Sequence, residues 1–140
     1  IGNIKNLNDS CYNKLCEVIN QTANNNELTL TLAISYGSLQ EISQAVRKIS
    51  DKVKNNLISI KNIDQKIIND HLYTRNLPPV DLLIRTGGEF RLSNFLLWQA
   101  AYAELYFTDV LWPDFRKEDF FDAIASFQNR ERRFGMIKQN

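Results

Sequence analysis

A run of arginines, glycines and a serine in the second half of the sequence has the residue types of an anion site. Residues 85–89 read Arg-Thr-Gly-Gly-Glu, and Arg91 and Ser93 follow. Guanidinium groups donate paired hydrogen bonds to phosphate oxygens, glycines let backbone amides approach a ligand, and a hydroxyl at a helix start adds a donor. The pattern predicts a phosphate or diphosphate site. The spacing fits equally well a structural turn whose arginines pair with Glu89 or Asp114.

Two further charged features could belong to such a site. Glu104 could pair with an arginine, which is the more common role, or help to hold Mg²⁺ against a diphosphate. Arg130, Arg132 and Arg133 are typical of a solvated helix end that the helix dipole favours. They could also form a tail that reaches an anionic ligand. The residues alone leave both pairs of alternatives open.

Three segments that could position these residues have the composition of strands. They are Leu28–Ile34, Val80–Thr86 and Glu104–Phe107. The first alternates, and the second is almost continuously apolar, as in a central strand covered on both faces. Strand, helices and strand in this order predict a right-handed crossover in a parallel α/β sheet. Because so few strands make a poor parallel sheet, we expect a larger sheet completed by missing chain or by a partner.

Apolar residues at helical spacing predict five helices. The first follows Asn8 and ends near residues 24–26, and the second begins at Ser38, where Glu41 three residues later suggests a capping box. A short helix is expected from Asp64 to Leu72, and another from about Ser93 to Tyr102. The last helix should carry an apolar face made by Phe120, Phe121, Ile124 and Phe127.

Composition bounds the class of protein. The chain has 140 residues, enough for one modest domain, and 17 basic against 16 acidic residues give a net charge of +1. This balance argues against a nucleic-acid partner. The single histidine, His71, makes a Ser-His-Asp triad improbable, and no apolar run approaches the length of a membrane span. Because the first residue is Ile1, we expect a processed or partial product.

Four stretches resemble the C-terminal signature of cis-prenyltransferases, most nearly that of the bacterial undecaprenyl diphosphate synthases. They are residues 85–89, 91–99, 103–107 and 111–115, and residues 130–135 resemble the Arg-x-Gly tail of the family. The likeness runs in order from about Leu28 to Gly135. It implies that residues 1–140 are the C-terminal portion of a single domain with the parallel-sheet α/β fold of that family.

The resemblance also implies an activity and a site. Members condense isopentenyl diphosphate onto farnesyl diphosphate, repeatedly and with cis geometry, to make undecaprenyl diphosphate, a carrier lipid for cell-wall precursors. The residues implied for the diphosphate of isopentenyl diphosphate are Arg85, Arg91, Leu92, Ser93, Arg133 and Gly135. Leu92 would contribute its backbone, and the tail would close over the site. Glu104 would help to bind Mg²⁺, reaching across a homodimer.

The sequence departs from the family pattern in three respects. In the loop after the first expected strand, Ser35, Ser38 and Leu39 stand where the family usually has asparagine, glycine and arginine. Phe90 stands where close relatives carry a histidine implicated in metal or proton handling. The N-terminal half of the family, with its phosphate loop, essential aspartate and product tunnel, is absent. The resemblance therefore implies no catalytic residue in this chain, which we expect to be inactive alone.

Two other functions stay open beside the enzyme. One is a non-catalytic partner subunit that lends its tail to a catalytic chain, and the other is a phosphate-binding α/β module. The intact set of arginines, serine and glutamate favours the enzyme. The resemblance implies a homodimer, a product that partitions to the membrane, and a cytoplasmic protein or one associated with the inner membrane face. The aromatic residues that suit a core or a dimer surface are Trp98, Tyr102, Tyr106, Phe107 and Trp112.

Overall fold

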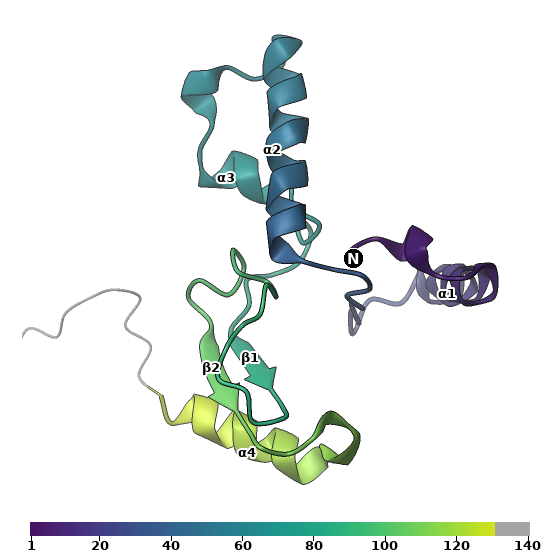
Figure 1. Ribbon diagram of the computed structural model, residues 1–140, viewed down its shortest axis with the longest axis vertical. Coiled ribbons are helices and arrows are strands. Elements are labelled where there is room, and N and C mark those ends of the chain that lie inside the picture. Colours follow the sequence, from purple (N-terminus) through teal and green to yellow (C-terminus); the bar gives the residue numbers. More distant parts are fainter. Residues whose placement is uncertain (131–140) are drawn as a thin grey trace, which may run out of the picture. The chain divides into compact units, whose positions relative to one another are not determined.

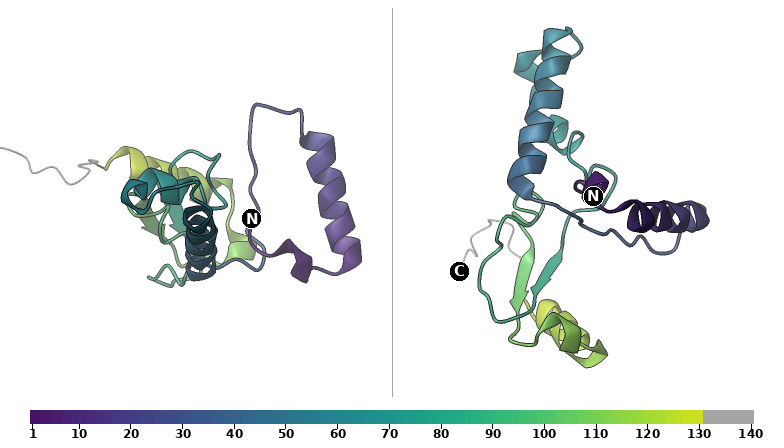
Figure 2. Two further views of the ribbon diagram at one scale, coloured as in Figure 1. Left: turned by 90° about the horizontal axis from the view of Figure 1, so that it is seen from above. Right: turned by 45° about the vertical axis from the view of Figure 1, so that its right-hand side comes forward.

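The computed structural model describes residues 1–130, which fall into two units. The first unit, Ile1–Leu77, is helical, and the second begins at Pro78 and contains a small parallel sheet. Figure 1 labels the main elements, and Figure 2 shows them from two further directions. Helices on a parallel sheet confirm the expected α/β class.

The first unit contains three α-helices. They are α1 (Asp9–Thr22), α2 (Ser38–Lys54) and α3 (Gln65–Asn69), with single 3₁₀ turns at Ile4–Asn6 and Ile60–Asn62. Asn8 caps α1, since its side chain accepts a hydrogen bond from the Cys11 backbone N–H at 2.9 Å. Asp64 caps α3 in the same way. The first three predicted helices are therefore confirmed, although α3 ends earlier than expected.

Packing in this unit joins α2 to α3, which lie beside each other in Figures 1 and 2. Ala45 and Ile49 of α2 are buried, as is Leu72 in the turn after α3. A helix of five residues such as α3 is too short to be stable through its own hydrogen bonds. Its stability therefore depends on the burial of these apolar side chains.

The predicted capping box at the start of α2 is wrong. Gly37 occupies the N-cap position, and Ser38 and Glu41 are both buried instead, at 0% and 1% exposure. The Glu41 carboxylate accepts hydrogen bonds from the Tyr36 hydroxyl at 2.5 Å and from the Tyr73 backbone N–H at 2.7 Å. Glu41 thus fixes the entry to α2 against the segment that follows α3.

The predicted strand Leu28–Ile34 is also wrong as a strand. Its only ladder contact among the described residues is an isolated parallel bridge between Ile34 and Gly2. Leu28 and Leu30 are 85% and 80% exposed. A strand forms only where a neighbour accepts its hydrogen bonds, and here residues 1–3 supply the only neighbour that the structure describes. The βαβ crossover predicted from this strand is therefore not formed within residues 1–130.

The sheet of the second unit has two parallel strands, β1 (Leu82–Arg85) and β2 (Glu104–Phe107). Leu82 pairs with Glu104, and Arg85 pairs with Phe107. Both strands were expected, and the bounds of β2 agree with the prediction. Within the described residues β1 has one neighbour, β2.

One helix, α4 (Lys117–Gln128), packs against β2 and follows a 3₁₀ turn at Trp112–Asp114. Ala123 is its fully buried residue, while Phe120 and Phe121 are 46% and 55% exposed. The predicted apolar face is thus wrong for these two phenylalanines. The inward face of α4 is centred on Ala123 instead. Ile124 and Phe127, the other two residues of the predicted face, are half-buried.

No helix forms over residues 93–102, where one was predicted. Ser93, Asn94 and Leu96 have φ angles of +46°, +64° and +46°, in the left-handed region. Such angles interrupt a right-handed helix at every occurrence. The segment is instead a series of turns that leads from the loop after β1 to β2, with Ala100 buried.

Candidate functional site

The loop after β1 brings Arg85 and Ser93 together. Arg85 is the last residue of β1, and its Nη1 donates to the Ser93 hydroxyl oxygen at 3.1 Å and to the Arg91 carbonyl oxygen. The remaining guanidinium nitrogens of Arg85 make no hydrogen bond or ion pair within residues 1–130. One nitrogen of the Arg85 guanidinium group, Nη1, therefore holds the loop together, and the other N–H groups remain available to donate to an anion.

Arg91 forms an ion pair with Glu89, as the structural alternative predicted for one of the arginines. Both side chains remain accessible, at 63% for Arg91 and 46% for Glu89. An exposed pair of this kind contributes at most about 1 kcal/mol, so an incoming anion could displace the carboxylate at small cost. Arg85 has no carboxylate partner among the described residues.

The glycine amides expected to face a ligand are already engaged. The Gly87 N–H donates to the Val110 carbonyl at 2.9 Å, and the Gly88 N–H donates to the Thr108 carbonyl at 2.9 Å. Both glycines have positive φ angles, +85° and +73°, which explains the residue type without a ligand. Since no helix begins at Ser93, the groups of this loop that remain available to an anion are side chains, with the Leu92 backbone between them.

Glu104 opens β2 and pairs with an arginine. Its Oε2 lies 3.0 Å from Nη1 of Arg130, just beyond α4, and the side chains are 26% and 36% exposed. The arginine alternative for Glu104 is thus the contact that the structure forms. Sequence reasoning missed Arg130 as the partner, because nothing in the spacing of residues 26 apart signals a contact.

Glu104 and the arginine loop lie at opposite ends of the sheet. Glu104 pairs with Leu82 at the amino end of β1, whereas Arg85 is at its carboxyl end. Three residues of strand separate the two levels by about 10 Å. The sequence reasoning placed the arginine loop at the carboxyl end, which the structure confirms, but a single copy of this unit does not bring Glu104 to that loop.

Other predicted residues are placed as follows. Arg133 and Gly135 lie outside the described residues. Phe90, which stands where the resemblance gives close relatives a histidine, is 76% exposed, and its ring centroid lies 5.3 Å from that of Phe107. Leu39 is also exposed. Sequence reasoning missed a groove in the first unit that contains the only histidine, His71.

Comparison with known proteins bears on this loop directly. The family model described as "Putative undecaprenyl diphosphate synthase" matches residues 1–135, nearly the whole chain and all of the arginine loop. The chain belongs to this prenyltransferase family. The resemblance inferred from the sequence is thereby confirmed, including its extension to the tail.

Curated relatives carry the same activity in their names. The chain is 51% identical over 135 residues to the farnesyl-diphosphate-specific ditrans,polycis-undecaprenyl-diphosphate synthase of Haemophilus influenzae, covering 96% of this chain and 56% of the relative. It is 50% identical over 135 residues to the synthase of the same name from Escherichia coli K12, covering 96% and 53%. The chain thus spans about half the length of the curated relatives it matches.

Solved structures confirm the fold of the family. A crystal structure of lavandulyl diphosphate synthase from Lavandula x intermedia, in complex with dimethylallyl diphosphate, matches with a TM-score of 0.93 and 38% identity, covering 97% of this chain and 58% of that one. A structure of "a probable undecaprenyl diphosphate synthase" from Campylobacter jejuni matches with a TM-score of 0.78 and 37% identity, covering 97% and 61%. Within residues 1–130 no helix has the length and apolar character needed to cross a bilayer.

Proposed function

We propose that this chain supplies the isopentenyl diphosphate site of a cis-prenyltransferase that elongates farnesyl diphosphate to undecaprenyl diphosphate. The observation that carries the proposal is the loop in which Arg85 contacts Ser93 and keeps unpaired guanidinium donors beside the accessible Arg91. Membership of the family and the names of relatives about 50% identical support the reaction type.

In this proposal the chain acts by charge. Ionisation of an allylic diphosphate leaves negative charge on its oxygens, and condensation requires both diphosphates to be held in fixed positions. The forked N–H groups of Arg85 and Arg91 bind diphosphate oxygens, and the Ser93 hydroxyl adds a donor. Glu89 must release Arg91 when the anion arrives, and the low cost of an exposed ion pair makes that exchange favourable.

Magnesium is the cofactor that we propose for the reaction, and Glu104 is the residue of this chain that would contribute to its site. A carboxylate suits Mg²⁺, but the described residues contain no group of three His, Cys, Asp or Glu side chains able to hold a metal. Glu104 therefore fits one position of a coordination shell completed by diphosphate and water. When bound, Mg²⁺ would neutralise charge on the diphosphate.

The geometry of Glu104 favours a homodimer. Because Glu104 lies at the other end of the sheet from the arginine loop of its own chain, we propose that it serves the site of a second copy. The exposed aromatic side chains of Tyr102 and Trp112, at 71% and 74%, suit burial between two copies. Product release toward a membrane, a cytoplasmic location and a role in cell-wall biogenesis belong to the same proposal.

The test is incorporation of labelled isopentenyl diphosphate by the full-length protein with farnesyl diphosphate and Mg²⁺. Arg85→Ala and Arg91→Ala should each lower kcat/KM by about 30- to 1000-fold, equivalent to ~2–4 kcal/mol of lost transition-state stabilisation. Arg116→Ala is the matched control, because Arg116 lies in the same unit and its guanidinium group contacts the Pro113 carbonyl. Near-normal activity of both loop variants would contradict the assignment of the arginines.

The likeness to lavandulyl diphosphate synthase raises a second candidate, a coupling of short prenyl diphosphates. That structure holds dimethylallyl diphosphate and has the TM-score of 0.93. The higher identity to the undecaprenyl diphosphate synthases favours the long-chain reaction. Mass spectrometry of the products decides between them, since one condensation per primer would identify the short-chain enzyme.

A further inference from the structure

A groove of about 440 Å³ lies in the first unit, and none of its lining residues is among those proposed to bind the diphosphate. The groove lies between helix α2 and residues 70–75, which directly follow α3. Its lining residues are all charged or titratable: Lys48, Asp51, Lys52, Asp70, His71 and Arg75. Lys48 and Lys52 are four residues apart and therefore share one face of α2.

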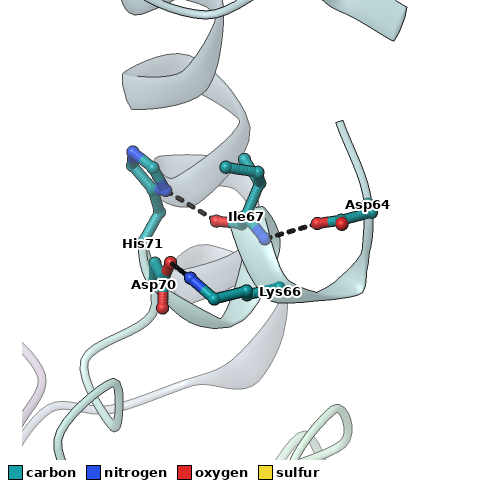
Figure 3. Close-up of polar contacts among 5 residues, drawn as sticks. All are labelled: Asp64, Lys66, Ile67, Asp70 and His71. Atoms are coloured by element: carbon teal, nitrogen blue, oxygen red, sulfur yellow. Dashed lines mark hydrogen bonds and ion pairs between the residues drawn. The ribbon is translucent and has the colours of Figure 1, made fainter. Parts of the chain in front are cut away.

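The positive charges of this groove are largely uncompensated. Within residues 1–130 the side chains of Lys52 and Arg75 make no hydrogen bond or ion pair, and Lys48 contacts only the face of the Tyr73 ring, 5.9 Å from its centroid. Asp70 forms an ion pair with Lys66, whose Nζ lies 3.1 Å from the Asp70 Oδ2. Lys66 is not among the lining residues of the groove, and Figure 3 shows the two side chains facing each other. The lining therefore carries three cations against two carboxylates, Asp51 and Asp70, and Asp51 has no cationic partner in the described part of the chain.

His71 lines one wall of the groove, and only one of its two ring nitrogens has a hydrogen-bond partner within residues 1–130. Its Nδ1 lies 2.6 Å from the Ile67 carbonyl oxygen. A dashed line marks this contact in Figure 3. A carbonyl can only accept, so Nδ1 donates the hydrogen bond. Nε2 is shielded from solvent and has no hydrogen-bond partner within residues 1–130. A ligand hydroxyl that reached it after a small side-chain shift would restore the missing bond.

We propose that this groove binds a small organic phosphate that carries hydroxyl groups. Lys48, Lys52 and Arg75 contact the phosphate, and Asp51 accepts a hydrogen bond from a hydroxyl. A divalent cation is a poorer occupant, because the described residues provide no group of three metal-ligating side chains. The proposal does not depend on the prenyltransferase reaction, because every residue that it uses lies in the first unit.

The test uses glycerol 3-phosphate as the probe and glycerol as the neutral control, with binding to the intact protein measured by NMR and calorimetry. To remove the arginine loop as a second anion site, the titrations are repeated in the Arg85→Ala/Arg91→Ala variant. Glycerol 3-phosphate should shift resonances of α2 and of residues 70–75 in both proteins, and glycerol should not.

Paired variants separate this site from general charge attraction. Lys52→Ala/Arg75→Ala removes two exposed lining cations and should weaken binding by at least about tenfold, since each charge-assisted hydrogen bond contributes to affinity. Arg47→Ala/Lys54→Ala removes the same residue types from exposed positions of α2 outside the groove and should leave affinity within about twofold. Equal weakening by both pairs, an unaffected Lys52/Arg75 variant, or loss of binding with Arg85 and Arg91 would each overturn the proposal.

Discussion

Removing Arg130 should tighten the response of the protein to Mg²⁺ while leaving its fold almost unchanged. Arg130 forms an ion pair with the Glu104 carboxylate, so a Mg²⁺ ion that binds there as proposed would have to displace it. With side chains 36% and 26% exposed, the pair is worth up to about 1 kcal/mol. Arg130→Ala should therefore raise the apparent affinity for Mg²⁺ by up to about fivefold, the factor that corresponds to this free energy. The free energy of unfolding should fall by no more than ~1 kcal/mol.

The assay is a Mg²⁺ titration of isopentenyl diphosphate incorporation, together with calorimetry of Mg²⁺ binding in the presence of pyrophosphate. Glu104→Gln should lose activity and the calorimetric signal, because the amide keeps the size of the side chain and removes its charge. Arg116→Ala serves as control, since its guanidinium group contacts backbone carbonyls. If Arg130→Ala weakened Mg²⁺ binding as strongly as Glu104→Gln did, the two residues would act together on the ligand, and the reasoning would be refuted.

Three further predictions concern stability. Glu41→Ala should lower the free energy of unfolding by ~2–4 kcal/mol in urea denaturation, because the buried carboxylate accepts hydrogen bonds from Tyr36 and Tyr73, whereas Glu17→Ala removes an exposed ion pair and an exposed hydrogen bond and should cost less than ~1 kcal/mol. Asn8→Ala should cost α1 about 1 kcal/mol and speed amide exchange in its first turn; unchanged exchange would contradict the cap. Gly87→Ala and Gly88→Ala should each cost ~1–2 kcal/mol in thermal unfolding because both φ angles are positive, and a neutral outcome at both would show that the turn can relax.

The parts of the fold that the sequence predicts are those set by local interactions. Helix α2 follows from its apolar spacing, and the start of α1 follows from Asn8, a residue type whose side chain satisfies a nearby backbone N–H group. The segment Leu28–Ile34 has the composition of a strand, but a ladder depends on a second strand that composition does not reveal. The turns after Ser93 were missed because left-handed φ angles at non-glycine residues leave no signal in an apolar pattern.

The candidate site divides in the same way. The position of Arg85 follows from a general rule, that parallel sheets bind ligands beyond the carboxyl ends of their strands. The contact between Arg85 and Ser93 joins residues eight apart in one loop, and the sequence analysis had already placed both in the same site. The pairing of Glu104 with Arg130 joins a strand to the residues beyond a helix, and only the packing of α4 on β2 determines it.

The separation of Glu104 from the arginine loop has a genetic consequence. If two copies share each centre, a chain defective at Arg85 and a chain defective at Glu104 can repair each other, because their mixed dimer contains one undamaged centre. Random mixing of equal amounts would restore about a quarter of normal turnover, since half of the dimers are mixed and each has one working centre of two. Neither mutant alone would contain an intact centre, so turnover recovered in the mixture would show that two copies share each centre.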